Sequence, residues 1–165
     1  MPFRSTKTYG HDIGLSCCFR QWRAQSHCAL LHGYALSVRL EFEADELDYR
    51  NWVIDFGSLK EVKELLQNHF DHKLVVAQDD PDLESLGQLS GLGLADVVVL
   101  PAVGCEAFAK WIYGAVYDWL INRTPHGERV FLASVEVAEH GANSAIYLGQ
   151  DWRQQVKNRN WARNG

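Results

Sequence analysis

The sequence predicts an α+β fold in which an antiparallel sheet carries two helices on one face. Segments near both ends alternate apolar and polar residues, which is the period-two pattern of half-buried strands. Two stretches between them place apolar residues at helical spacing. Hairpins separated by helices favour a two-layer arrangement with the helices on one side of the sheet. A parallel sheet would require strict strand–helix alternation, which this pattern lacks.

The N-terminal half is predicted to begin with a hairpin and to continue into a helix. Residues 36–43 alternate in a strand expected to begin near Tyr34, and residues 13–22 are its expected antiparallel partner. The sequence Trp52-Val-Ile-Asp-Phe leads into the helix, where Ser58 is the expected N-cap and Glu61 completes a capping box. The apolar stripe of this helix consists of Leu59, Val62, Leu65, Leu66 and Phe70.

The C-terminal half is predicted to hold two helices, a short strand and a hairpin. A short helix is expected over 82–89 and a longer one over 106–121. The short apolar run 97–100 predicts a buried strand between them. Residues 130–138 alternate again, and residues 144–148 return as their hairpin partner.

The length of 165 residues predicts one domain. We expect that domain to span residues 13–150, with an N-terminal extension over 1–12 and a basic tail over 151–165. Hydrophobic residues make up 47% of the chain and charged residues 22%, which is typical of a globular protein and excludes a disordered one. No apolar run approaches the roughly 18–20 residues of a transmembrane helix, so no membrane partner is expected.

Charge and cysteine content narrow the class further. The chain has 21 acidic and 16 basic residues, and the tail is basic, so the rest of the chain is acidic. An acidic body argues against a nucleic-acid partner. The 4 cysteines include no Cys-x-x-Cys pair, and the N-terminus has no apolar signal segment. We therefore expect free thiols and a cytoplasmic location.

Two local clusters carry candidate proton-transfer chemistry. Cys28 precedes His32 by four residues at the entry to a strand, where its thiol could serve as a nucleophile or a base. Asp71 adjoins His72 just after the first long helix, where the carboxylate can orient the imidazole. The alternative for the second pair is a histidine that interacts with the helix dipole beside a turn aspartate.

Two further positions are candidates for ligand binding. Glu139 ends a predicted strand, where its carboxylate can accept a pair of N–H groups from a heterocycle. The alternative is a solvated loop glutamate. Cys105 and Glu106 begin the second long helix, whose free backbone N–H groups can bind an anion or a ring carbonyl. Glu106 alternatively only complements the helix dipole.

Taken in order, these elements resemble the 6-pyruvoyltetrahydropterin synthase and 6-carboxytetrahydropterin synthase family over residues 13–149. The shared motifs are Cys28-x-x-x-His32-Gly33, Trp52-Val-Ile-Asp-Phe, Asp71-His72, Glu106 and Glu139. The spacer of three residues between Cys28 and His32 is similar in length to that of the bacterial 6-carboxytetrahydropterin branch. This resemblance implies a role in queuosine biosynthesis.

The resemblance implies a fold and an activity. The implied fold is the T-fold, in which subunits join their sheets into a trimeric barrel and two trimers stack as a homohexamer. The implied reaction removes triphosphate from 7,8-dihydroneopterin triphosphate or a related pterin. Cys28 would be the proton-abstracting thiolate, with Asp71 and His72 as the second acid–base group. Glu139 would anchor the pterin ring, and Cys105 and Glu106 would line its pocket.

The chain differs from this family at the positions that bind the metal. The family binds zinc through three histidines, but Phe19 and Tyr34 stand at two of these positions, which leaves His32 as the candidate metal ligand. Zinc is a possible cofactor if other residues rebuild the site, and the candidates are Cys17, His11 and His27. Two functions therefore stay open: a pterin synthase-like lyase, or a zinc-less T-fold protein that binds a pterin or purine with altered or no catalysis.

Overall fold

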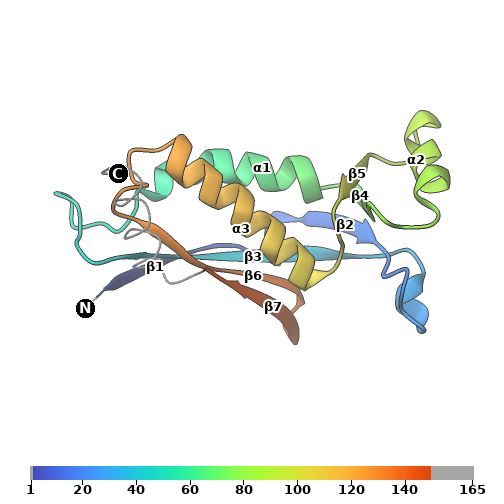
Figure 1. The fold of residues 1–165 in the computed structure, drawn as a ribbon, viewed down its shortest axis with the longest axis horizontal. Helices are drawn as coiled ribbons and strands as arrows, with labels where there is room; N and C mark the ends of the chain where they lie inside the picture. Colours follow the sequence, from blue (N-terminus) through green and yellow to red (C-terminus); the bar gives the residue numbers. More distant parts are fainter. Residues whose placement is uncertain (1, 150–165) are drawn as a thin grey trace, which may run out of the picture.

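Helices α1 (Lys60–Phe70) and α3 (Cys105–Asn122) cover one face of a seven-stranded sheet (Figure 1). The structure, a computed structural model, describes residues 2–149, so the basic tail expected over 151–165 lies outside the described residues. A third helix, α2 (Leu83–Gly91), lies at one end of the molecule, away from the other two. The strands are β1 (Phe3–Tyr9), β2 (Leu15–Phe19), β3 (His32–Ala44), β4 (Lys73–Ala77), β5 (Val97–Leu100), β6 (Phe131–His140) and β7 (Asn143–Leu148). The predicted α+β class, with two helices on one face, is confirmed.

The long strand β3 organises the sheet, whose order is β5-β4-β2-β3-β6-β7. It pairs antiparallel with β2 and β6, and β6 pairs antiparallel with β7, as the alternating patterns predict. The sheet also has a parallel part that the sequence did not predict, because β4 pairs parallel with both β2 and β5. Strand β4 was not predicted. Four of its five residues are buried, so it shows a continuous apolar run in place of alternation.

The segment set apart as an N-terminal extension contains strand β1. This strand pairs antiparallel with β3 from Phe3 opposite Ala44 to Tyr9 opposite Val38. The Tyr9 hydroxyl is buried and donates a hydrogen bond to the Leu59 carbonyl, at 3.0 Å. Because its backbone and a buried side chain both bond to the rest of the chain, this segment is part of the sheet.

The core lies between the helices and the sheet face beneath them. Alternate residues of β3 point into it, and Leu36, Val38, Leu40 and Phe42 are fully buried. Helix α1 contributes the predicted stripe, although Leu65 is only half-buried, and α3 contributes residues such as Phe108, Ile112 and Val116. Each such side chain stabilises the fold by about 1.5–3 kcal/mol through burial.

The predicted capping box at the start of α1 is wrong. The chain enters the helix through a 3₁₀ turn, Phe56–Leu59, whose cap is Asp55. The Asp55 carboxylate accepts the Gly57 N–H at 2.8 Å, and the Ser58 hydroxyl donates to the Asp55 carbonyl at 2.6 Å. Asp55 can cap because it precedes the first turn, whereas Ser58 lies inside that turn.

Candidate active site

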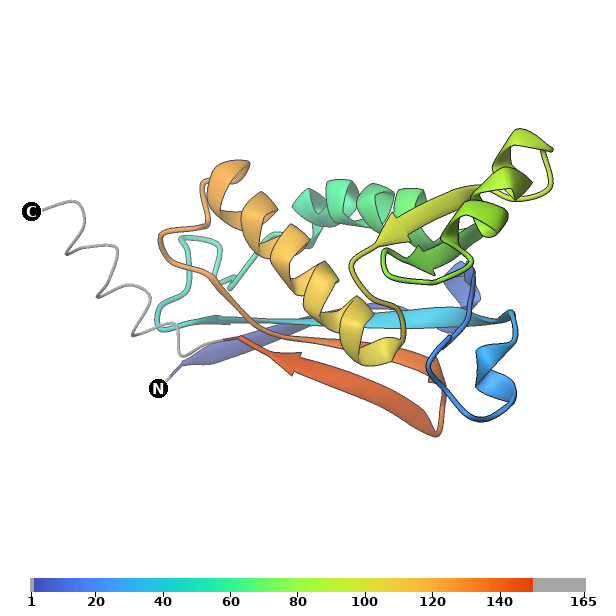
Figure 2. The ribbon, with the colours of Figure 1, turned by 45° about the vertical axis from the view of Figure 1, so that its right-hand side comes forward.

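The candidate site lies where β3 begins, β6 ends and α3 starts. Figure 2 shows the N-terminal end of α3 close to β3 and to the β6–β7 hairpin. Cross-strand pairing places Phe19 opposite His32 and Cys17 opposite Tyr34, so these side chains share the sheet face that carries the helices. The ring of Tyr34 also approaches that of His140 at the end of β6, with centroids 6.1 Å apart.

The rings of Phe19, His32 and Tyr34 form one cluster, which we call the aromatic trio. Their centroids are 5.1 Å apart for Phe19 and His32, 6.2 Å for Phe19 and Tyr34, and 5.6 Å for His32 and Tyr34. Phe19 is buried and also packs edge-on against Phe108 of α3, whereas His32 and Tyr34 are half-buried. The buried side of the trio is therefore Phe19, and its accessible rim is formed by the polar groups of His32 and Tyr34.

Glu139 and Cys105 form a second cluster beside the aromatic trio. The Cys105 side chain is hydrogen-bonded to Glu139, and burial together with the charge of this carboxylate raises the pKa of Cys105 to about 12. The thiol therefore stays protonated at neutral pH and donates to the carboxylate. Glu139 is half-buried and Glu106 is exposed, so both keep carboxylate oxygens accessible at the start of α3.

Cys28 approaches this cluster from the loop between β2 and β3. It is half-buried in a 3₁₀ turn, His27–Ala29, where its N–H donates to the Ser26 hydroxyl at 3.3 Å. Its carbonyl accepts the Gln21 N–H at 2.8 Å. Tyr34 is the shared neighbour: burial raises its pKa, and so do the charges of Glu139, Cys28 and Cys105. The structure thus brings Cys28, Tyr34, Cys105 and Glu139 into electrostatic contact within one chain.

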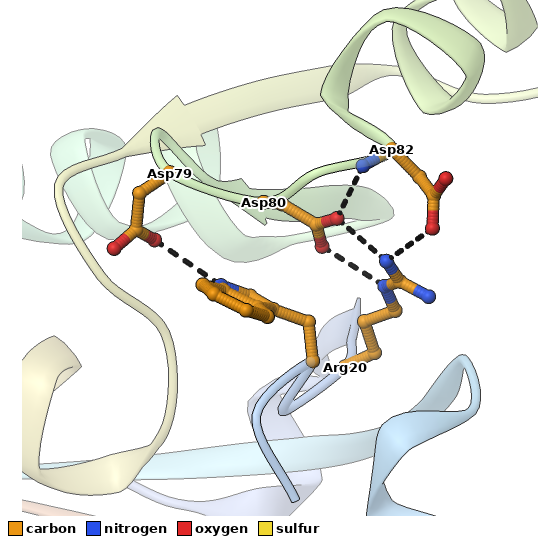
Figure 3. A network of polar contacts seen from close by, with 5 residues as sticks. Arg20, Asp79, Asp80 and Asp82 are labelled. Carbon is orange, nitrogen blue, oxygen red and sulfur yellow. Dashed lines mark hydrogen bonds and ion pairs between the residues drawn. The ribbon is translucent and has the colours of Figure 1, made fainter.

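Arg20 ties the start of the Cys28 loop to the segment that precedes α2 (Figure 3). Its guanidinium donates to both carboxylate oxygens of Asp80, at 2.9 and 2.6 Å, and to Asp82 at 2.7 Å. Asp80 is buried, and these bonds hold its pKa below the usual range. The sequence did not predict this network, because Asp80 and Asp82 lie 60 and 62 residues from Arg20 along the chain.

Asp71 and His72 form the expected dyad, but away from Cys28. The His72 Nδ1 lies 2.7 Å from Asp71 Oδ1, which also accepts the Ser16 N–H at 3.3 Å. The His72 side chain is 84% exposed, on a left-handed backbone with φ of +55°. Ser16 lies near the start of β2, whereas the Cys28 loop leaves from its far end, roughly 10 Å further along the strand. One chain therefore does not bring the dyad to the thiol.

The residues at the implied metal positions do not fit zinc. Phe19 offers no donor atom, and the raised pKa of Tyr34 keeps its phenol neutral, which leaves His32 alone. Cys17, the nearest substitute, is buried, and burial raises its pKa to about 12, so it is a thiol in this setting. Within residues 2–149, no group of three or more His, Cys, Asp or Glu side chains could hold a metal ion.

Comparison with known proteins places the chain in a family. Residues 11–150 match the profile described as 6-pyruvoyl tetrahydropterin synthase. The chain belongs to the 6-pyruvoyl tetrahydropterin synthase family. Two relatives named 6-carboxy-5,6,7,8-tetrahydropterin synthase come from Rickettsia felis and Rickettsia conorii, and they are 37% and 35% identical over 60 residues. These stretches cover 36% of the chain and 44% of each relative, so the match spans less than half the length of the curated relatives.

Solved structures agree on the T-fold. An uncharacterized protein from Wolinella succinogenes superposes with a TM-score of 0.75 at 21% identity, covering 91% of this chain and 99% of that one. The 6-pyruvoyl tetrahydropterin synthase of Plasmodium vivax gives a TM-score of 0.62 at 16% identity, covering 92% and 99%. No helix within residues 2–149 is both long and apolar enough to cross a membrane.

Proposed function

We propose that this protein is a lyase of the tetrahydropterin synthase type that acts on 7,8-dihydroneopterin triphosphate or a related pterin. The observation that carries the proposal is the grouping of Glu139, Cys105, Tyr34 and Cys28 at one end of the sheet. A carboxylate that binds a heterocycle and a thiol that can act as a base are then available to a single ligand. Membership of the family and the names of the relatives support the same activity.

In this proposal Glu139 holds the ring and Cys28 acts on the side chain. The carboxylate accepts the ring N–H and the exocyclic amino group of the pterin, and the Cys105 thiol fixes its orientation. The Cys28 thiolate removes a carbon-bound proton of the ligand's side chain. The electron pair released forms a carbon–carbon double bond and expels triphosphate as the carbon–oxygen bond breaks. Asp71 and His72 supply the second proton-transfer group.

The distance between the dyad and the thiol supports a site shared between subunits. We propose that copies of the chain join their sheets at β1 and β7, the outer strands of the antiparallel part of the sheet, into a trimeric barrel, and that trimers pair as a hexamer. The apolar side chains of Phe3 on β1 and of Ile146 and Leu148 on β7 are exposed in the single chain. A neighbouring subunit would then bring its Asp71–His72 dyad to Cys28. The free thiols support the proposal that this oligomer works in a reducing, cytoplasmic setting.

The direct test is release of triphosphate from 7,8-dihydroneopterin triphosphate by the purified full chain. Cys28→Ala should abolish release, because it removes the proposed base. Cys18→Ala is the matched control, because this half-buried cysteine points to the other face of the sheet. Turnover that persists in Cys28→Ala contradicts the assignment.

Mixing two inactive variants tests the shared site. If each site takes Cys28 from one subunit and His72 from another, oligomers refolded from equal amounts of Cys28→Ala and His72→Ala regain about a quarter of wild-type activity through random assembly. If both residues act within one chain, the mixture stays inactive. Size-exclusion chromatography with light scattering measures the oligomeric state of each preparation.

A second candidate function is a zinc-less T-fold protein that binds a pterin or purine without catalysis. The observation in its favour is the replacement of metal ligands by Phe19 and Tyr34, because these residues do not hold the metal ion that would act as a Lewis acid. Pterin binding without triphosphate release by the wild-type chain would select this alternative over the lyase.

A further inference from the structure

The Tyr34 hydroxyl is available to a ligand. The residue is half-buried, and its ring is held among Phe19, His32 and His140. Within residues 2–149 the hydroxyl has no hydrogen-bond partner. A phenol whose ring is packed while its hydroxyl stays open presents a positioned hydrogen-bond donor and acceptor.

His32 complements this donor with an acceptor. Its Nδ1 lies 2.8 Å from the Leu30 carbonyl, which can only accept, so Nδ1 carries the proton of the neutral ring. The Nε2 atom therefore presents a lone pair. Because the rings of His32 and Tyr34 meet edge to face with centroids 5.6 Å apart, the donor and the acceptor lie on one rim of the aromatic trio.

We infer that Tyr34 and His32 form a hydrogen-bonding pair that binds a hydroxylated side chain of the ligand. The Tyr34 O–H donates to one side-chain oxygen, and His32 Nε2 accepts a hydrogen bond from a neighbouring hydroxyl. The pair occupies the place at which the family's zinc site is implied, and it uses no metal. This inference rests on the proposed function, because it takes the ligand to be a pterin held by Glu139.

The location of the pair supports this role. Tyr34 lies within electrostatic range of Glu139, which would hold the ring, and of Cys28, which would act on the side chain. A phenol keeps its proton at neutral pH, so the Tyr34 hydroxyl has a proton to donate. A ligand that spans from the anchor to the thiol therefore passes the rim of the trio.

The pair determines specificity between pterins that differ only in the side chain. Neopterin carries three hydroxyl groups on its side chain, whereas 6-methylpterin carries none. The wild-type chain should bind neopterin more tightly than 6-methylpterin, and Tyr34→Phe should weaken neopterin binding about three- to tenfold, which is the usual loss for one neutral hydrogen bond. Binding of 6-methylpterin should not change, because that ligand makes no bond to Tyr34.

The experiment is a fluorescence titration of the purified full chain with both pterins, with and without a chelator. Tyr49→Phe is the matched control, since Tyr49 is 85% exposed on a distant loop. Thermal unfolding of Tyr34→Phe checks that the fold is intact. Glu139→Gln should weaken both ligands equally, which tests the anchor separately from the pair.

Three results would overturn the inference. The first is a Tyr34→Phe variant that keeps the full preference for neopterin. The second is equal weakening of both ligands by Tyr34→Phe, which would indicate a structural role. The third is a preference that disappears when metal is chelated. Failure of the wild-type chain to bind either pterin would refute the proposed function, and the inference with it.

Discussion

Replacing Arg20 by methionine should destabilise the protein, because it leaves a buried carboxylate without its cation. The Asp80 side chain is 1% exposed and the Arg20 side chain 20% exposed, and two hydrogen bonds join them. Breaking a buried pair by removing one partner costs about 3–5 kcal/mol. Because Arg20 is partly exposed, we expect a loss of about 3 kcal/mol in the free energy of unfolding, or about 6–12 °C in Tm.

The assay is urea and thermal unfolding at fixed protein concentration, since an oligomer's stability depends on concentration. Arg23→Met is the control. It removes an ion pair to Asp79 in which both side chains are largely exposed, and it should cost less than about 1 kcal/mol. If Arg20→Met costs no more than Arg23→Met, the network does not stabilise the fold as we argue.

The same pair has a pH signature. Arg20 lowers the pKa of Asp80 in the folded chain, so the carboxylate stabilises the fold at every pH above its unfolded pKa of about 4. This contribution is lost as pH falls through the lower, folded pKa. The stability difference between the wild-type chain and Arg20→Met should therefore be constant near neutral pH and narrow below about pH 4. A difference that widens in acid would contradict the sign.

Three further predictions concern the site. Iodoacetamide at pH 8 should leave Cys17 and Cys105 unmodified in the native protein, because both thiols are buried and burial raises their pKa values to about 12. Peptide mass spectrometry that finds either cysteine labelled would refute this prediction. The double variant Phe19→His with Tyr34→His should take up about one zinc ion per subunit, measured by elemental analysis, while the wild-type chain should not. Gly33→Ala should lower Tm, because the added Cβ would lie 2.8 Å from the Cys17 carbonyl oxygen. An unchanged Tm would show that strands β2 and β3 can move apart at this point without a loss of stability.

Patterns with a strong period predicted most of the fold. Strands β3 and β6 alternate along most of their length, and α3 shows an apolar side at helical spacing, so their predicted ranges agree with the structure to within a few residues. Strand β4 was missed because its side chains are buried on both faces. Strand β1 was missed because its first six residues are exposed or half-buried, which leaves no apolar pattern to detect.

The site could be predicted in part. Each candidate residue was identified from local motifs and from the family resemblance, and Cys28, Cys105 and Glu139 do come together. The Arg20–Asp80 pair could not be anticipated. Asp80 belongs to a run of acidic turn residues, and only the fold shows which of these carboxylates is buried. The separation of Asp71–His72 from the thiol likewise follows from strand register, which the sequence does not specify.

The positions that differ from the family's metal ligands and the positions that match its motifs have different chemical roles. In the proposed function Glu139, oriented by Cys105, accepts hydrogen bonds from the ring, and Tyr34 with His32 binds hydroxyl groups in the same way, so recognition of the ligand needs no metal. A Lewis acid would do more than bind, because it acidifies the carbon-bound protons next to the oxygen that it holds. A neutral phenol withdraws far less electron density. The replacement of two metal ligands should therefore cost catalysis more than affinity, and the proposed function assigns most of the proton transfer to the thiol and to a dyad from another subunit.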